Sequence, residues 1–563
     1  MAMSRNGSLH CITRRGFVEG AGAAVGLGLL GCRMLPNRCA SRGLASTYWC
    51  TWATQAETLK GHKLTGELKF PGDQGVPGVR DNLNEDVIFG PKGWINLFPG
   101  YRGDMLFLLD DGWDVPYGAK GGRDGVHSFG SLAPDRERFP SLGAGASDRD
   151  RLRELARRVM GNGWKGLGVW VACQAYRERF EAPFRLDDLK EDLRRKFDEA
   201  AHAGVKYWKV DWGVHNFHVW YRRLMSEMKE RYYPELIIDH CRGFNNAING
   251  QVDPHLKPDD EFRNVGHAGR IFGNPEYDPI TRDYEEIMSF ADVFRTYDSA
   301  HPLTTATMLE RAAWELECAD KSSSRVVINT EDEPLIAAGL GLELSMMRAP
   351  VWPGNHVRDV RPRHRRMAED MRCIAWQRSI PPFGSDAMAK TLYSEKSIRE
   401  EWHFIPGECW FTGKREISYY QVAPACVTRG LALPEVKGMD GEVPFVVGSR
   451  HPCGALTFAS LPLLHPMKMS YTPKAEVCFD AALEFGSPVG VFGRFGSLVL
   501  DDRTDGRRVL AHDILGGEVS DITALCRRDA GRIALPGDEL LRIGSSQNPP
   551  GDDSEPGVIV EVV

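Results

Sequence analysis

The segment Lys206-Tyr207-Trp208-Lys209-Val210-Asp211-Trp212-Gly213 is a short apolar run that ends in a carboxylate, with a lysine two residues before it. Because side chains alternate along a strand, Lys209 and Asp211 are expected to point to the same side. In a (β/α)8 barrel, residues at the carboxyl ends of the strands face the active site. Asp211 is therefore a candidate catalytic carboxylate, and Lys209 is the neighbour that keeps it ionised. The alternative is a strand-end aspartate that caps the next helix.

Segments of the same kind recur along the chain, each followed by an amphipathic stretch. Leu186 to Ala203, for example, is charged on one side and carries Leu189, Leu193 and Phe197 on the other. Eight such units predict a (β/α)8 TIM barrel, an α/β fold. A doubly wound open sheet is the structural alternative, but it rarely takes eight consecutive units. The eight apolar runs are Thr47 to Gln55, Met105 to Trp113, Gly166 to Gln174, Val205 to Gly213, Glu235 to Gly243, Asp292 to Ser299, Arg325 to Asp332 and Leu344 to Trp352.

After about residue 395 the pattern changes to short apolar segments separated by turn residues. This pattern predicts a C-terminal domain of antiparallel β structure, in the form of a β-sandwich. We therefore predict three parts: a leader and linker over residues 1–45, a catalytic barrel over 46–395 and the sandwich over 396–563. The strands expected in the sandwich are Glu416 to Val422, Glu442 to Val447, Gly454 to Ala459, Gly496 to Leu500, Glu518 to Leu525, Gly531 to Leu535 and Val558 to Val563.

The first residues have the features of an export signal. Thr13-Arg14-Arg15-Gly16-Phe17 is a twin-arginine pattern, and the small, apolar run Ala21 to Leu30 follows it. Leu29-Leu30-Gly31-Cys32 resembles a lipoprotein cleavage box, in which Cys32 becomes the lipidated first residue. We expect export by the twin-arginine route to the periplasm or cell surface. A plain signal without lipidation and an uncleaved anchor are the alternatives.

Composition excludes some functions. The 563-residue chain has a formal net charge of -7, which gives no reason to expect nucleic acid as a partner. Its 13 cysteines include no CxxC pair, which argues against a zinc ribbon or a redox motif. His215, His218 and His240 lie near strand ends, but their spacing fits no tight zinc motif. We therefore predict no metal and no cofactor.

Carboxylates also end two other predicted strands, as Asp110-Asp111-Gly112-Trp113 and as Arg295-Thr296-Tyr297-Asp298. A ring of acids with aromatic walls suits hydrolysis of a glycosidic bond, in which one carboxylate attacks or activates water and a second donates a proton. Asp110 and Asp111 could instead cap a helix at Gly112. The tryptophans at strand ends, which could equally be plain barrel core, are Trp49, Trp52 and Trp170.

Several short motifs follow one another in a specific order and spacing. They are Trp49-Cys50-Thr51-Trp52, Asp110-Asp111-Gly112-Trp113, Phe139-Pro140-Ser141, Trp164 to Trp170, Lys209-Val210-Asp211, and Pro234-Glu235-Leu236 leading to Cys241-Arg242-Gly243. Together they resemble the α-galactosidase clan, glycoside hydrolase families 27 and 36, over most of residues 46 to 355. The order of barrel and then sandwich is more like family 27.

The resemblance implies roles for these residues. Asp211 resembles the nucleophile that forms a covalent glycosyl intermediate, and Asp298 resembles the acid/base. Asp110 and Asp111 resemble the pair that holds the 4- and 6-hydroxyls of the sugar. A retaining mechanism follows, which requires the two catalytic carboxyl groups to lie about 5–5.5 Å apart. The other substrate-binding residues implied are Lys209 and Arg295 as cationic partners, Trp52 and Trp170 as subsite walls, and Cys241, Arg242 and Gly243 in the loop that reads the 2-position.

The chain departs from the family pattern in three ways. In family 27 the acid usually comes four residues after the arginine, whereas Asp298 comes three after Arg295, and Asp292 is the fallback. The family's late Asp-Pro-Asp on strand seven is replaced by Asn329-Thr330-Glu331-Asp332-Glu333-Pro334. Arg242 adds a cation that could bind a sulfate or carboxylate on the sugar, or form a structural salt bridge.

We therefore expect an exported, retaining, exo-acting α-galactosidase-like glycosidase that acts on an oligo- or polysaccharide. We expect no nucleic-acid partner, and membrane contact only through a lipid anchor on Cys32. One alternative is a surface carbohydrate-binding lipoprotein that has lost catalysis. Another is a related glycosidase whose sugar is sulfated or N-acetylated, or is β-L-arabinopyranose.

Overall fold

The structure is a computed structural model of the chain. It describes residues 46–58, 75–119, 128–143, 145–242, 278–295, 305–322, 325–348, 366–385, 390–404, 417–465 and 469–563. The predicted leader with Cys32, and the site residues Gly243 and Asp298, lie outside these ranges. Among the residues described, no helix has the length and apolar character needed to cross a membrane.

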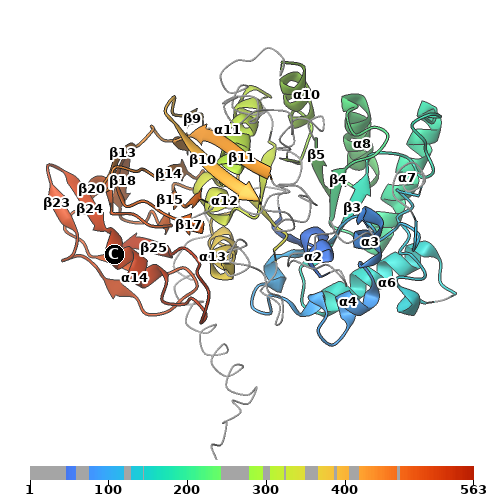
Figure 1. The fold of residues 1–563 in the computed structure, drawn as a ribbon, viewed down its shortest axis with the longest axis horizontal. Helices are drawn as coiled ribbons and strands as arrows, with labels where there is room; N and C mark the ends of the chain where they lie inside the picture. Colours follow the sequence, from blue (N-terminus) through green and yellow to red (C-terminus); the bar gives the residue numbers. More distant parts are fainter. Residues whose placement is uncertain are drawn as a thin grey trace, which may run out of the picture.

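Eight parallel strands close into a barrel in the order β1 to β8, with β8 returning to pair with β1 (Figure 1). The chain is therefore a TIM barrel, as predicted, and each strand falls on one of the eight apolar runs. β8 begins one residue earlier than expected. The strands are β1 (Tyr48–Cys50), β2 (Leu106–Leu109), β3 (Gly166–Ala172), β4 (Tyr207–Asp211), β5 (Ile237–Cys241), β6 (Val293–Arg295), β7 (Val327–Glu331) and β8 (Glu343–Met346).

Alternation along each strand separates the barrel interior from the layer under the helices. On β4, Trp208 faces outward and stacks on Phe197 of the helix α7 (Leu186–Ala203), with ring centroids 4.7 Å apart. Lys209 faces inward, where it contacts Asp110 from β2. Lys209 is therefore buried inside the ring of strands, and Asp211, two residues on, shares its side, as predicted.

The helices of the barrel part cover the outside of the strands (Figure 1). α7 begins at Leu186 and ends at the left-handed Gly204, as its periodicity predicts. The helices are α2 (Trp52–Glu57), α3 (Gly75–Asp81), α4 (Glu85–Phe89), α6 (Asp148–Gly161), α7 (Leu186–Ala203), α8 (Val219–Tyr232), α10 (Asp278–Met288), α11 (Thr305–Ser322), α12 (Pro334–Leu340) and α13 (Met367–Gln377). Three short 3-10 turns cover Trp94–Asn96, Arg102–Asp104 and Pro140–Leu142.

The C-terminal part is a sandwich of an eight-stranded and a five-stranded sheet, whose inner faces share one apolar core. The strands of the eight-stranded sheet, in spatial order, are β22 (Ser520–Asp521), β21 (Val509–Asp513), β25 (Gly557–Val562), β19 (Val489–Phe492), β15 (Leu456–Leu461), β14 (Phe445–Arg450), β12 (Cys426–Arg429) and β9 (Thr391–Tyr393). Those of the five-stranded sheet are β13 (Glu435–Gly438), β18 (Ala475–Glu484), β20 (Ser497–Arg503), β24 (Arg532–Pro536) and β23 (Arg527–Asp529).

The prediction of a sandwich is thus confirmed, with two additions. Most strand pairs are antiparallel, but β12 with β14, β15 with β19, and β18 with β20 pair in parallel. A helix that the sequence reading missed, α14 (Gly537–Gly544), lies before the last strand. Two hairpin-like pairs lie outside the main sheets, formed by β10 (Ser397–Phe404) with β11 (Ile417–Pro424) and by β16 (Leu463–His465) with β17 (Met469–Tyr471).

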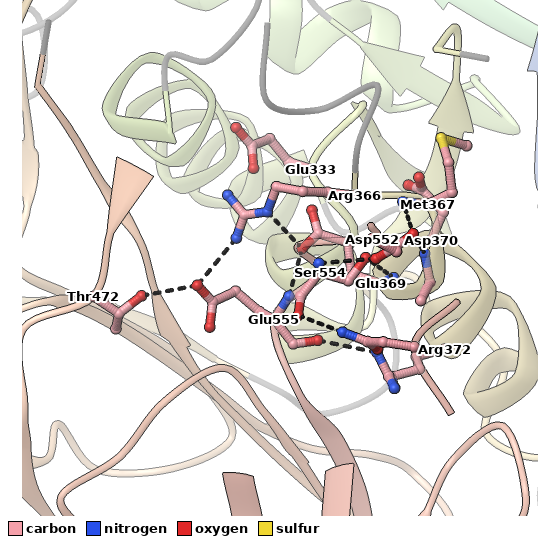
Figure 2. A network of polar contacts seen from close by, with 12 residues as sticks. Glu333, Arg366, Met367, Glu369, Asp370, Arg372, Thr472, Asp552, Ser554 and Glu555 are labelled. Carbon is pink, nitrogen blue, oxygen red and sulfur yellow. Dashed lines mark hydrogen bonds and ion pairs between the residues drawn. The ribbon is translucent and has the colours of Figure 1, made fainter. Parts of the chain in front are cut away.

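Helices α12 and α13 pack between the barrel and the outer face of the eight-stranded sheet (Figure 1). Gly339 of α12 approaches β14 so closely that a Cβ there would lie 2.4 Å from the Val447 side chain. The first amides of α13 are capped from far along the chain, because Asp552 accepts hydrogen bonds from the backbone N–H groups of Met367 and Ala368 (Figure 2). The two parts are therefore joined by a close, partly ionic interface.

Candidate active site

Three side chains from three strands meet inside the carboxyl end of the barrel. The Lys209 ammonium of β4 donates to the Asp110 carboxylate after β2, with Nζ and Oδ2 2.7 Å apart. The Cys50 thiol of β1 donates to the same oxygen at 2.9 Å. Lys209 is 0% and Asp110 3% exposed, so this ion pair is removed from bulk water. A buried charge is tolerated only with such a partner, which fixes both side chains in place.

Asp211 lies at the end of the same strand as Lys209 and is 4% exposed. One carboxylate oxygen accepts the backbone N–H of Trp212 at 2.6 Å. The other lies 3.4 Å from the indole nitrogen of Trp170 on β3. Trp170 is itself positioned by strand pairing with Lys209 and by a hydrogen bond from Trp113 to its carbonyl oxygen. The carboxylate is therefore held in one orientation at the barrel mouth.

Asp111 has a different ion-pair partner from Asp110. It is turned toward α3, where Arg80 Nε lies 2.9 and 2.8 Å from its two carboxylate oxygens. Burial raises the pKa of Asp111 above its ordinary range, and the Arg80 guanidinium opposes that shift. The residues after β2 form turns rather than a helix, so neither aspartate caps a helix at Gly112. The sequence motif did not indicate Arg80 as a partner.

A second ion network lies deeper in the barrel, and the sequence reading missed two of its members. Arg295, at the end of β6, pairs with Asp239 of β5 at 3.0 Å and with Glu331 of β7 at 2.5 Å. Tyr48 also donates to Asp239, at 3.4 Å. Asp239 could have been found from alternation, since it lies two residues before Cys241 and pairs in register with Lys209.

Glu343 on β8 is a further buried acid of the interior. Its carboxylate accepts from the Tyr207 hydroxyl at 3.1 Å and from the Asn329 amide at 3.1 Å. Burial, with the nearby negative charge of Asp239 as the second cause, raises its pKa to about 8. At neutral pH this carboxyl is therefore mainly protonated, which lowers the negative charge under the site.

Cys241 is the last residue of β5, and Arg242 begins the loop that follows. Cys241 is buried and pairs in register with Arg295. Arg242 donates to Asp283 of α10 at 2.8 Å, and its guanidinium lies 4.6 Å from the Phe217 ring centroid. The salt bridge that the sequence left open as an alternative to anion binding is thus present.

The tryptophans at the strand ends, of which Trp52 and Trp170 were predicted as subsite walls, separate into two groups. Trp49 faces outward and is buried among Trp94, Phe107 and Trp164, so it belongs to the core. Trp52 begins α2, is partly buried and packs against the interior cluster that contains Tyr48 and Cys50. Together with Trp170 beside Asp211, Trp52 remains a predicted wall of a sugar site.

The fallback acid Asp292 does not share this site. It precedes β6, at the amino end of the barrel, where it pairs with Lys229 and accepts the backbone N–H of Ile238. Asp211 ends its strand at the opposite rim. Asp292 is thus unsuited as the partner of Asp211, and Asp298, which lies outside the described residues, stays a prediction.

The three histidines near strand ends do not converge. His240 faces outward, toward Ser226 and Arg222 of α8. His215 and His218 lie in the loop after β4, where their Nδ1 atoms are 2.9 Å apart. In the part of the chain that the structure describes, no group of three or more His, Cys, Asp or Glu side chains is arranged to hold a metal ion.

Asp114, in the turn after β2, gives a stability prediction. Its Oδ1 has no hydrogen-bond partner among the described residues, and burial raises its pKa to about 6. The native state therefore holds its proton more tightly than the unfolded chain, and stability falls as pH rises from about 4 to 6. We expect Asp114→Asn to be more stable than wild type by up to about 3 kcal/mol at pH 7, with the difference vanishing near pH 4.

Urea denaturation at pH 4, 5, 6 and 7 measures this difference. Asp480→Asn is the matched control, because Asp480 lies exposed on the sandwich beside Arg532 and is expected to change stability by less than about 0.5 kcal/mol at each pH. A constant difference between Asp114→Asn and wild type across this range would contradict the assignment.

No protein-family model matches the chain, and no curated protein matches it. Several solved structures, in contrast, do match the chain. A proposed α-galactosidase of Bacteroides fragilis is 10% identical, with a TM-score of 0.40, 92% of this chain covered and 79% of that one. α-Galactosidase I of Mortierella vinacea is 9% identical, with a TM-score of 0.36 and coverage of 92% and 98%.

A family 27 β-L-arabinopyranosidase of Geobacillus stearothermophilus, solved with arabinose, is 10% identical, with a TM-score of 0.37 and coverage of 94% and 99%. These identities and TM-scores are too low to transfer an activity from any of the three proteins. The case for a function therefore depends on the chain's own residues.

Proposed function

We propose that this chain is a retaining glycoside hydrolase that releases terminal α-galactose-type sugars by double displacement. The observation that supports it most is the pair of contacts at adjoining strand ends, Lys209 with Asp110 and Trp170 with Asp211. An acid held by a buried cation is suited to accept hydrogen bonds from sugar hydroxyls. A second acid, fixed beside an indole, is suited to attack the anomeric carbon.

In this proposal Asp211 is the nucleophile and Asp298 the acid/base. Asp110, on the same side of the mouth, binds sugar hydroxyls, and Lys209 holds it in place. Arg295 and Asp239 form the floor of the site. The ion pair of Arg242 with Asp283 favours an uncharged galactose-type sugar over a sulfated one, since the cation already has a carboxylate partner.

The direct test is hydrolysis of α-galactosyl fluoride, followed by proton NMR during the first turnovers. Net retention, with α-galactose appearing before mutarotation, is expected. β-Galactose as the first product would overturn the retaining mechanism. Absence of turnover, together with binding of α-galactosides, would favour the carbohydrate-binding lipoprotein. Parallel assays with aryl β-L-arabinopyranoside and aryl α-N-acetylgalactosaminide separate the neighbouring specificities.

The Lys209–Asp110 pair makes a further prediction about activity. Replacing Lys209 with methionine leaves Asp110 buried without its cation, so the hydroxyl-binding acid becomes protonated or displaced. We expect kcat/KM to fall by about 10²–10³-fold and the free energy of unfolding by about 3–5 kcal/mol. Steady-state kinetics and urea denaturation measure the two effects.

Lys229→Met is the matched control. Lys229 is also buried and pairs with an aspartate, Asp292, but at the amino end of the barrel. Its loss is expected to lower stability with kcat/KM changed less than about twofold, because it touches no part of the site. Equal losses of activity in both variants would mean that Lys209 acts only through the fold.

We also propose export by the twin-arginine route, with Cys32 lipidated. Cell fractionation of the full chain tests this, with Arg14 and Arg15 both replaced by lysine to block the route. Cys32→Ser distinguishes an anchored protein, which would move from the membrane to the soluble fraction, from one that was never lipidated.

A further inference from the structure

Large apolar side chains are exposed unevenly over the described part of the barrel. They all lie on segments that follow β2, β3 and β4, the strands that carry or adjoin Asp110, Trp170 and Asp211, and Met160 is the one among them on α6. Single exposed apolar residues are ordinary, but a group on one rim marks an interaction surface. The members of the group are Tyr117, Phe180, Phe184, Leu186, Phe217 and Trp220.

Three of these rings lie on the loops after β3 and β4 or in the first turn of α8, and we call them the aromatic shelf: Phe184, Phe217 and Trp220, which are 36%, 46% and 48% exposed. Phe217 follows Asp211 by only six residues in the same loop. Its ring is covered on one side by the guanidinium of Arg242, which begins the loop after β5. Phe217 therefore lies between the carboxyl ends of β4 and β5, in the loop that follows the candidate nucleophile.

Trp220 is held by the histidines of the same loop. The His215 and Trp220 rings meet edge to face, with centroids 5.1 Å apart, while His218 is nearly parallel to Trp220 at 6.0 Å. His215 is in turn fixed by Glu178 of the loop after β3, with Nε2 and Oε1 2.9 Å apart. An exposed indole with this much support keeps one orientation, which lowers the entropy lost on binding.

The same carboxylate joins the loop that carries Phe184 to the loop that carries the histidines. Glu178 is buried, and its Oε1 accepts the backbone N–H of Phe184 at 2.9 Å. The loops after β3 and β4 are therefore fixed to each other through one buried acid.

We propose that the aromatic shelf binds the sugar residues beyond the bond to be cleaved, so that the natural substrate is a polysaccharide or long oligosaccharide rather than a short galactoside. This inference rests on the proposed function. A flat, fixed aromatic ring packs against the apolar C–H face of a pyranose. The hydroxyl groups at the edge of the sugar then stay in contact with water. The shelf lies on the carboxyl rim of the barrel, on the side from which the rest of the substrate chain must leave an exo-acting enzyme. For this reason we propose that a saccharide binds there.

The test compares two substrates with the same glycosyl group. α-Galactosyl fluoride has no sugar beyond the cleaved bond, whereas galactomannan has a polymeric one. For Phe217→Ala and Trp220→Ala we expect kcat/KM on galactomannan to fall by about five- to tenfold each, and kcat/KM on the fluoride to stay within twofold. Equal changes in kcat/KM on both substrates, or no change in kcat/KM on the polymer, would contradict binding of the polymer by the shelf.

Phe485→Ala is the matched control. Phe485 is 63% exposed on the sandwich and lies 4.9 Å from the Arg507 guanidinium, much as Phe217 lies against Arg242. It is expected to leave both activities unchanged. Unaltered thermal midpoints would show that all three variants fold.

Failure of the proposed function leaves a distinct signature, which is no turnover of α-galactosyl fluoride by wild type. In that case affinity electrophoresis through gels containing galactomannan, arabinan or a sulfated galactan is the readout. Retardation of wild type that is lost in Phe217→Ala and Trp220→Ala supports the shelf. If none of the three polymers retards wild type, the proposal that the shelf binds saccharide is wrong. It is also wrong if wild type binds anionic lipid vesicles and the same substitutions abolish that binding.

Discussion

Asp211→Ala is expected to lower kcat/KM on α-galactosyl fluoride by about 10⁴-fold or more, because no neighbouring group replaces the lost carboxylate as nucleophile. Asp211 is nearly buried, and both of its oxygens are engaged, by the Trp212 amide and by the Trp170 indole. Its loss leaves a space of carboxylate size beside the anomeric carbon. Azide is expected to enter that space and restore turnover, giving the inverted β-galactosyl azide.

Asp292→Ala is the control for Asp211→Ala. It removes a carboxylate from the next strand but one, at the opposite rim of the barrel, and is expected to affect stability far more than kcat/KM. Undiminished activity in Asp211→Ala would mean that Asp211 is not the nucleophile. Lost activity without azide rescue would leave Asp211 in a binding role and move the nucleophile elsewhere.

Arg372→Met is expected to have a large effect on stability, lowering the free energy of unfolding by about 3–5 kcal/mol. Arg372 of α13 binds Asp513 of β21 through two hydrogen bonds, at 3.0 and 2.7 Å, and both side chains are 0% exposed. It also donates to the carbonyl oxygen of Glu555 (Figure 2). Without the guanidinium, Asp513 remains a buried anion at the interface of barrel and sandwich.

Urea denaturation followed by tryptophan fluorescence measures this loss. Arg378→Met, at the end of the same helix, is the matched control, because its ion pair with Asp104 is exposed to solvent and is expected to contribute less than about 1 kcal/mol. Adding Asp513→Leu to Arg372→Met should recover part of the stability, since the unpaired charge is then removed. Equal effects of Arg372→Met and Arg378→Met would contradict the prediction.

Local pattern predicted the eight barrel strands and α7, because alternation and helical periodicity are properties of short segments. Lys209 and Asp211 were placed on one side of β4 for that reason. The fallback choice of Asp292 was wrong, because this aspartate precedes β6 and so lies at the amino end of the barrel, as its place at the start of the apolar run already indicated. In the sandwich, local pattern missed whole strands, among them β18 and β19. The parallel pairs of the sandwich were missed because pairing partners there are far apart in the chain. The helix α14 is a local element of eight residues that the reading overlooked.

The acids that end the strands could be found from the sequence, but their partners could not. Nothing near Asp110 or Asp111 indicates that the first binds Lys209 and the second Arg80. Asp239 and Glu331 were missed as partners of Arg295 for the same reason. Alternation places a side chain inside or outside the barrel, but it does not say which side chain on another strand lies opposite.

The amino-acid sequence alone therefore determined the order of strands, the side of each strand that faces inward and the acids at the strand ends, since these depend on neighbouring residues. The tertiary structure decided which charges neutralise one another, which acids stay protonated and which aromatic rings line the rim. These depend on the closure and register of the barrel, which bring together residues up to a hundred or more positions apart, and on burial, which sets the energy of each charge.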